Sequence, residues 1–147
     1  ILDVGRLVNC VAASQKWHEE ISPRFDPKNI KPLSKPQNVL YLIWEKPSMS
    51  IGRDTFIHKM LERQGFNNVF GSSDRYPEIS DEEIRDKNPD LIFLSSEPYP
   101  FKEKHRVAWQ ENFPNTQVVL VDGEMFSWYG SRMALAATYF EELKQSL

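Results

Sequence analysis

The sequence predicts a three-layer α/β domain in which a short parallel sheet of about four strands is flanked by helices. Two observations carry this prediction. Short runs of β-branched and aromatic residues alternate with segments of helical spacing over residues 38–147, and such alternation is typical of parallel strands joined by crossover helices. A proline-rich stretch separates this region from an amphipathic pattern at the start of the chain, so a long helix is expected to precede the domain.

The expected elements follow in order along the chain. Apolar residues recur at helical spacing from Leu2 to about Ile21, so we expect one long helix within residues 1–25, with Cys10 as a small buried residue. Residues 26–37 form a connector. Strands are then expected at Val39–Trp44, Asn68–Phe70, Asp90–Ser95 and Thr116–Val121, where β-branched and aromatic residues gather.

Two helices of the domain carry apolar stripes, and a third has a start signal. The stripes are Phe56, Ile57, Met60 and Leu61, and Met133, Ala136, Ala137, Phe140 and Leu143, which we expect to face the core. Ser80 and Glu83 fit a capping box, so a helix should begin near Ser80. In SIGRDT, we expect Gly52 to ease a tight turn and Asp54 or Ser50 to cap the next helix.

Composition excludes several classes of protein. The chain has 147 residues, 40% of them apolar, and a net charge of −3, which fits one globular domain and offers no basic stripe for nucleic acid. No apolar run approaches the roughly 18 residues of a membrane span. The single cysteine excludes an internal disulfide. The chain starts without methionine and inside a helical pattern, and we expect it to be a piece of a longer chain.

Catalytic and metal-binding motifs are not evident. His18, His58 and His105 have no histidine or cysteine partner at metal-ligand spacing, so no metal site is predicted. Glu97 and Glu124 each follow a predicted strand. Either residue can be a solvated loop acid, a general base or a hydrogen-bonding contact for a ligand.

Aromatic residues gather after the carboxyl ends of the predicted strands, where open α/β sheets bind ligands. Their exposure would indicate a flat, largely apolar partner. They are Trp44, Tyr99, Phe101, Phe126, Trp128 and Tyr129, with Tyr76 in another loop.

Four motifs carry a family resemblance: YLIWEKPSMSIGRDTFIHKMLERQGFNNVF, RYPEISDEEI, PDLIFLSSEPYPFKEKH and VDGEMFSWYGSRM. They cover about three quarters of the chain, which resembles the C-terminal lobe of helical-backbone (class III) periplasmic substrate-binding proteins of ABC transporters. The receptors for cobalamin and ferric siderophores have the most similar motifs. The helix over residues 1–25 resembles the backbone helix that joins the two lobes of such proteins, and the resemblance implies that this sequence lacks the N-terminal lobe.

The resemblance implies a role for particular residues. Met49 and Tyr76 match positions that present aromatic rings to the corrin, and Glu124 matches an acid on the last binding loop. Trp128 stands where the cobalamin binder can carry an arginine, so a stacking surface replaces a guanidinium. Glu82 matches a surface acid that meets the membrane permease.

The implied function is binding without chemistry. The domain would capture a metal chelate such as cobalamin, haem or a ferric siderophore, with Trp44, Met49, Tyr76, Glu97, Tyr99, Glu124, Phe126 and Trp128 as ligand contacts. The cobalt or iron would belong to the ligand, and the protein would lie in the periplasm or on the cell surface as a lipoprotein. Two alternatives remain: a flavodoxin-like enzyme domain that uses Glu97 and Glu124, and a protein-interaction module that uses the aromatic loops.

Overall fold

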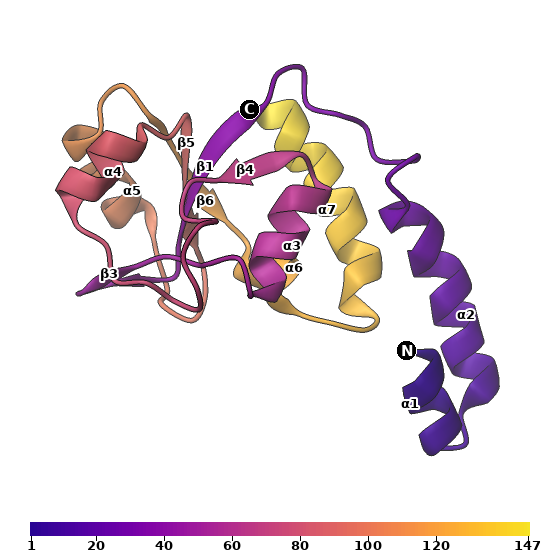
Figure 1. Cartoon of the computed structure of the whole chain (residues 1–147). Helices are drawn as coiled ribbons and strands as arrows, with labels where there is room; N and C mark the ends of the chain where they lie inside the picture. The colour runs from indigo at the N-terminus through magenta and orange to yellow at the C-terminus, as the bar shows by residue number, and fades with distance from the viewer. The chain divides into compact units, whose positions relative to one another are not determined.

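The computed structural model describes residues 1–147 (Figure 1). The chain divides into two compact units. Unit 1 comprises Ile1–Pro32 and Trp128–Leu147, and unit 2 comprises Leu33–Ser127. We describe each unit in turn.

Unit 2 is built on a four-stranded parallel sheet with the order β4-β1-β5-β6. The strands are β1 (Gln37–Leu42), β4 (Phe66–Asn68), β5 (Leu91–Ser95) and β6 (Gln117–Val121). The four predicted strands are therefore present, each within a few residues of its expected position. A small antiparallel hairpin, β2 (Trp44–Glu45) with β3 (Ser48–Met49), follows β1 directly, and the sequence pattern did not predict it.

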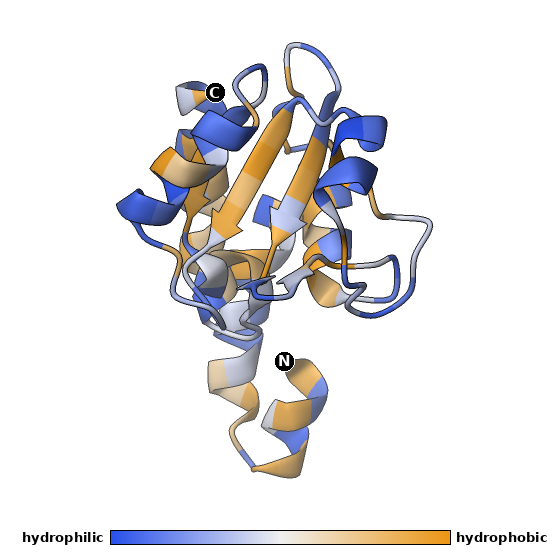
Figure 2. Ribbon diagram, turned by 90° about the vertical axis from the view of Figure 1, so that its left-hand side faces the viewer, coloured by the Kyte–Doolittle hydropathy of each residue, from blue (hydrophilic) through white to orange (hydrophobic).

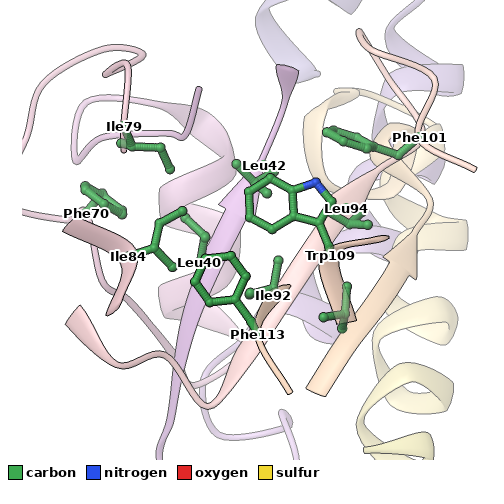
Figure 3. Packing of buried hydrophobic residues seen from close by; sticks show 11 residues of the cluster. Leu40, Leu42, Phe70, Ile79, Ile84, Ile92, Leu94, Phe101, Trp109 and Phe113 are labelled. Carbon is green, nitrogen blue, oxygen red and sulfur yellow. The ribbon is translucent and has the colours of Figure 1, made fainter. Parts of the chain in front are cut away.

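One face of the sheet packs against α4 (Asp81–Lys87) and α5 (Glu103–Asn112). Successive strand residues point to opposite faces, and Leu40, Leu42, Ile92 and Leu94 point to this one. Figure 3 shows these side chains beside the rings of Trp109 from α5 and of Phe113, which follows α5 directly. The two rings stack on each other, with their centroids 5.5 Å apart. Burial of this apolar surface is the main stabilising contribution of the face.

The opposite face carries α3 (Phe56–Arg63) and α6 (Gly123–Ser127). Tyr41 and Phe93, the alternate residues of β1 and β5, contact the Phe126 ring at centroid distances of 5.0 and 6.1 Å. Unit 2 therefore has the predicted three layers, with helix, sheet and helix visible in Figure 1. Both central strands carry apolar runs (Figure 2), and Val39–Leu42 of β1 and all residues of β5 are buried, as expected for a sheet covered on both faces.

The helix starts in unit 2 follow side-chain capping. Ser80 and Glu83 form the predicted capping box at the start of α4. The cap of α3 differs from the prediction, because Thr55 accepts the His58 backbone N–H. Ser50 is instead buried and donates to the Tyr41 carbonyl, and Asp54 accepts from the Arg75 backbone N–H.

Unit 1 consists of α1 (Leu2–Leu7), α2 (Val11–Ile21), the 3-10 turn η1 (Ser22–Phe25) and α7 (Arg132–Ser146). The single long helix that we predicted is wrong. The first helix ends at Leu7, and the backbone changes direction before α2. In this connection Asn9 adopts a left-handed φ of 55°, a conformation that asparagine tolerates better than most residues. A Cβ on Gly5 would lie 2.0 Å from Ser14 Oγ, so glycine permits the close packing of α1 on α2.

The break also changes the environment of Cys10. The residue stands at the start of α2 and its side chain is exposed, contrary to the prediction of a buried helix residue. Val4, Leu7, Val8 and Val11 are exposed as well. Most of the periodic apolar pattern near the start of the chain is thus not buried within unit 1.

Candidate ligand-binding site

The strand order of unit 2 places a ligand crevice at one position. The chain passes from β1 to its neighbour β4 and then returns to β5 on the other side of β1. In open α/β sheets, ligands bind beyond the carboxyl ends of the strands at such a reversal. The expected site therefore lies between the segments that follow β1 and β5.

A pocket of about 560 Å³ occurs at this position. We call it the strand-end pocket; it is lined by Ile43, Trp44, Met49, Ile57, Tyr76, Glu97, Pro98 and Ser127. The volume lies within the range of small-molecule sites, about 300–1,000 Å³. Its lining is mostly apolar, with one carboxylate, that of Glu97, and two hydroxyls, those of Tyr76 and Ser127. Such a surface suits a largely apolar ligand with a polar edge.

Backbone pairing fixes three of the pocket's side chains. Trp44 pairs with Met49 across the β2–β3 hairpin, and Ile43 N–H donates to the Met49 carbonyl at 3.0 Å. The segment that carries Tyr76 runs antiparallel to β3, with Ser50 N–H donating to the Pro77 carbonyl at 3.0 Å and Ile79 N–H to the Ser48 carbonyl at 2.9 Å. Trp44 is 40% exposed and Tyr76 is 50% exposed, so both rings are available to a ligand.

Tyr99 supports the hairpin instead of lining the pocket. Its ring meets Trp44 edge-on at 5.5 Å, and its hydroxyl donates to Glu45 Oε2 at 2.8 Å. This hydrogen bond, together with partial burial, raises the pKa of Tyr99 above its ordinary value. Tyr99 therefore positions the Trp44 ring.

Glu97 is held in place by neighbours on two elements. Ser127 Oγ lies 2.7 Å from Glu97 Oε1, and buried Ser95 donates to the Glu97 carbonyl at 2.6 Å. A Cβ on Gly123 would lie 2.6 Å from Glu97 Cγ and 2.4 Å from Ser95 Oγ. Glycine at position 123 thus allows α6 to approach the carboxylate that faces the pocket.

Other residues with a predicted binding role lie outside the strand-end pocket. Phe126 is fully buried between Tyr41 and Phe93, so it is a core residue and not the loop ring that we predicted. Phe101 is also buried. The helix α6 explains the difference, because it begins directly after β6 and turns Phe126 inward. Glu124 is half-buried in the first turn of α6 and does not line the strand-end pocket.

Trp128 and Tyr129 belong to unit 1. They line a second hollow of about 460 Å³ with Trp17 and Glu20 from α2 and Arg132 and Leu135 from α7. We call this the α2–α7 hollow. Four of the predicted ligand contacts are exposed or half-buried rings. Trp44 and Tyr76 share the strand-end pocket, Tyr99 packs on Trp44, and Trp128 lines the α2–α7 hollow.

Four residues of the strand-end pocket were absent from the predicted site: Ile43, Ile57, Pro98 and Ser127. Ile57 was assigned to the core stripe of α3, but it is half-buried and lines the pocket. Ile43 ends the apolar run of β1, and Ser127 follows Phe126 without any motif of its own. The topological rule on strand ends would have indicated Ile43, whereas Ser127 carries no local signal.

Glu82 lies in the exposed first turn of α4. Its two neighbours are engaged within the domain: Asp81 accepts from Asn112 Nδ2 at 2.7 Å, and Glu83 completes the capping box. Hydrogen bonds from Ser80 hold the pKa of Glu83 below its ordinary value. Glu82 makes no such bond, so its carboxylate faces solvent.

No group of three or more His, Cys, Asp and Glu side chains is arranged to hold a metal ion. The helices are all too short or too polar to cross a lipid bilayer. The polar side-chain groups among the residues of the strand-end pocket are the Glu97 carboxylate, the Tyr76 and Ser127 hydroxyls and the Trp44 indole N–H.

The structure defines an α/β domain with a pocket at its strand ends, and comparison with known proteins gives its family. Residues 1–119 match the sequence model of the periplasmic binding protein family. The chain belongs to this family and has the fold of a lobe of its class III members. No curated protein sequence matches the chain.

Solved structures share the fold at low sequence identity. A possible iron-binding periplasmic protein of Staphylococcus epidermidis superposes with a TM-score of 0.77 at 20% identity, covering 97% of this chain and 58% of that one. A periplasmic haem-binding protein of Vibrio cholerae gives 0.76 at 18% identity, with coverages of 96% and 60%. The vitamin B12-binding protein of the same organism gives 0.62 at 21% identity, with coverages of 90% and 53%. The chain thus spans between half and three fifths of the length of these structures.

Proposed function

We propose that this chain is the C-terminal lobe of the substrate-binding component of an ABC importer, and that the strand-end pocket holds one face of a metal chelate. The observation that carries the proposal is the meeting of Trp44, Met49, Tyr76 and Glu97 at the switch point of the sheet. The candidate ligands are cobalamin, haem and a ferric siderophore. The segment over residues 1–25 would be the remnant of the helix that joins two lobes.

The exposed rings supply the driving force. Covering the exposed part of Trp44 or Tyr76 removes on the order of 100 Å² from water, which contributes about 2–3 kcal/mol for each ring. Association costs at least about 4 kcal/mol in lost translation and rotation. One lobe alone is therefore expected to bind weakly, and a second lobe that closes on the other face of the chelate would strengthen binding.

The polar edge of the ligand would meet Glu97, whose carboxylate is oriented by Ser127. No histidine or cysteine lines the pocket, which supports a ligand that brings its own cobalt or iron. Glu124 and Trp128 remain predicted contacts on the basis of the resemblance alone. We propose neither Glu97 nor Glu124 as a catalytic group, because members of this family are binding proteins of transporters.

Delivery of the ligand requires a permease, and we propose Glu82 as the docking contact. Its carboxylate is solvent-exposed and unpaired on α4, whereas the carboxylates of Asp81 and Glu83 form hydrogen bonds within the domain. The protein would act in the periplasm or as a cell-surface lipoprotein. In a reconstituted importer, Glu82→Lys should reduce ligand-stimulated ATP hydrolysis, and Asp86→Lys on the same helix should not.

The pocket is tested by titrating the chain with cyanocobalamin, haemin and ferrichrome, following absorbance and equilibrium dialysis. Trp44→Ala and Tyr76→Ala should each weaken the ligand that binds by about tenfold, since one stacking contact is lost. Val107→Ala removes an exposed apolar side chain of α5 outside the pocket and should leave affinity unchanged. Absence of binding to all three chelates, or wild-type affinity in both aromatic variants, would contradict the proposal.

The same titration separates a receptor from an enzyme. Glu97→Gln keeps the shape of the side chain and removes its charge, so it should change affinity only. Conversion of a bound ligand by the wild-type chain that disappears in Glu97→Gln would favour the enzyme alternative.

A further inference from the structure

His105 is a buried histidine in the first turn of α5, with 9% of its surface exposed. Its ring meets two aromatic rings edge-on, that of Tyr99 at a centroid distance of 5.5 Å and that of Phe101 at 5.7 Å. A buried imidazole needs a hydrogen-bond partner for each of its ring nitrogens. Both nitrogens of His105 have one, and the two partners lie on different segments of the chain.

The backbone of Lys102 fixes the tautomer of His105. Lys102 N–H donates to His105 Nδ1 at 2.8 Å. Because a backbone N–H can only donate, Nδ1 is the acceptor and carries no proton, so the proton of the neutral ring is on Nε2. His105 therefore presents an N–H donor to the side of the ring that faces Tyr99.

This donor sets the direction of the Tyr99 hydroxyl. Nε2 of His105 lies 3.4 Å from the Tyr99 hydroxyl oxygen, and a hydroxyl that accepts there directs its own proton to another partner. That partner is Glu45 Oε2 at 2.8 Å, in β2 next to Trp44. A chain of three hydrogen bonds thus runs from the start of α5 to the hairpin of the strand-end pocket, and the bonds of such a chain strengthen one another.

We propose that His105 is a positioning residue of the strand-end pocket, which holds the Trp44 ring through Tyr99 and Glu45. His105 itself does not line the pocket. The Tyr99 ring contacts both His105 and Trp44, each at a centroid distance of 5.5 Å, so a change at His105 reaches the pocket through one intermediate side chain. The consequence for chelate binding rests on the proposed function.

Two substitutions separate the roles of the two nitrogens. In His105→Asn, the amide oxygen can replace Nδ1 as the acceptor for Lys102 N–H, but no donor reaches Tyr99. In His105→Gln, the amide nitrogen can replace Nε2 as the donor to Tyr99, but Lys102 N–H loses its acceptor. Each variant therefore keeps one hydrogen bond and serves as the control for the other.

The position of the Trp44 ring is followed first without ligand, by NMR of the tryptophan indole N–H signals. We expect His105→Asn and Tyr99→Phe to shift the Trp44 signal, whereas His105→Gln should leave it near its wild-type position. Trp17, which belongs to unit 1, gives the internal reference. Urea denaturation should show the opposite order, with the larger loss of stability in His105→Gln, because a backbone donor at the start of α5 loses its partner.

Chelate affinity is then measured with whichever of cyanocobalamin, haemin and ferrichrome binds to the wild-type chain. His105→Asn should bind it about twofold more weakly, since one hydrogen bond of the chain is lost, and His105→Gln should bind it as the wild type does. Tyr99→Phe combined with His105→Asn should bind like Tyr99→Phe alone, because both changes interrupt the same chain.

An unchanged Trp44 signal in His105→Asn would overturn the inference, and so would equal shifts in the two His105 variants. Wild-type chelate affinity in His105→Asn, or additive losses in the double variant, would also overturn it, because His105 would then act independently of Tyr99. Absence of chelate binding to the wild-type chain would reject the proposed function, and the Trp44 signal would still decide whether His105 positions the ring.

Discussion

The strand-end pocket and the α2–α7 hollow both present aromatic rings, but the two are supported in different ways. In the first, Trp44 and Met49 are paired across a hairpin and Tyr76 lies on a segment hydrogen-bonded to β3. In the second, the rings extend from α2 and from the residues before α7, and Arg132 is held against Trp128 by a ring contact. Backbone pairing fixes the direction of every side chain on the paired segment. We therefore expect the rings of the strand-end pocket to be preformed, whereas the rings of the α2–α7 hollow depend on side-chain packing between helices.

The largest expected effect separates core rings from surface rings. Phe126→Ala should lower the free energy of unfolding by about 3–5 kcal/mol, because it leaves a cavity between the sheet and α6. Tyr129→Ala should change it by less than about 0.5 kcal/mol. Urea denaturation measures both. Similar losses for the two variants would remove the distinction between the two regions.

Two glycines give a second contrast. Gly123→Ala should lower the free energy of unfolding by about 1–3 kcal/mol and weaken chelate binding, since the new Cβ displaces Glu97 or Ser95. Gly130 has a φ of 73° and no heavy atom near its would-be Cβ. Gly130→Ala should therefore cost about 1 kcal/mol through backbone strain without changing chelate affinity. Unchanged chelate binding in Gly123→Ala would contradict the placement of Glu97.

The support of Trp44 by Tyr99 should depend on pH. Folding raises the pKa of Tyr99, mainly through the hydrogen bond to Glu45. The stabilisation that this hydrogen bond gives to the folded state is therefore complete below the ordinary tyrosine pKa of about 10. It is lost as the pH rises through the raised pKa of Tyr99 in the folded state. Chelate affinity should fall over this alkaline range in the wild type.

Tyr99→Phe is the control for this titration. The variant should bind slightly more weakly at neutral pH and should lack the part of the alkaline decline that Tyr99 causes. Superimposable pH profiles for the two proteins would show that the hydroxyl does not position Trp44.

The smallest effect is expected at the start of unit 1. Leu7 is 84% exposed, so Leu7→Ser should alter the free energy of unfolding by less than about 0.5 kcal/mol. Thermal unfolding followed by circular dichroism checks this. A loss of several kcal/mol would mean that the apolar face of α1 is buried in solution.

Sequence reasoning recovered the layers of unit 2 because local patterns and global topology agree there. Some signals there are contained in a short stretch of sequence: the apolar runs of β1 and β5, and the capping box at Ser80. Such signals can be recognised without knowledge of contacts between distant residues. The break at Asn9 was missed because helical periodicity continues across it, and a left-handed residue interrupts a helix without changing the spacing of apolar side chains.

The site was predicted in part for a related reason. Trp44, Met49, Tyr76 and Glu97 were singled out and share one pocket. Phe126 was misplaced because a one-turn helix begins where a loop was expected, and its inward direction depends on the packing of α6 against Tyr41 and Phe93. The role of Tyr99 depends on its contact with Glu45, 54 residues away in sequence, and no local pattern reports such a contact.

The exposed thiol of Cys10 has a practical use. Because the chain contains no second cysteine, a maleimide dye would attach at this one position, which lines neither the strand-end pocket nor the α2–α7 hollow. The emission of such a label would report changes within unit 1 in real time, because Cys10 stands at the start of α2 in that unit.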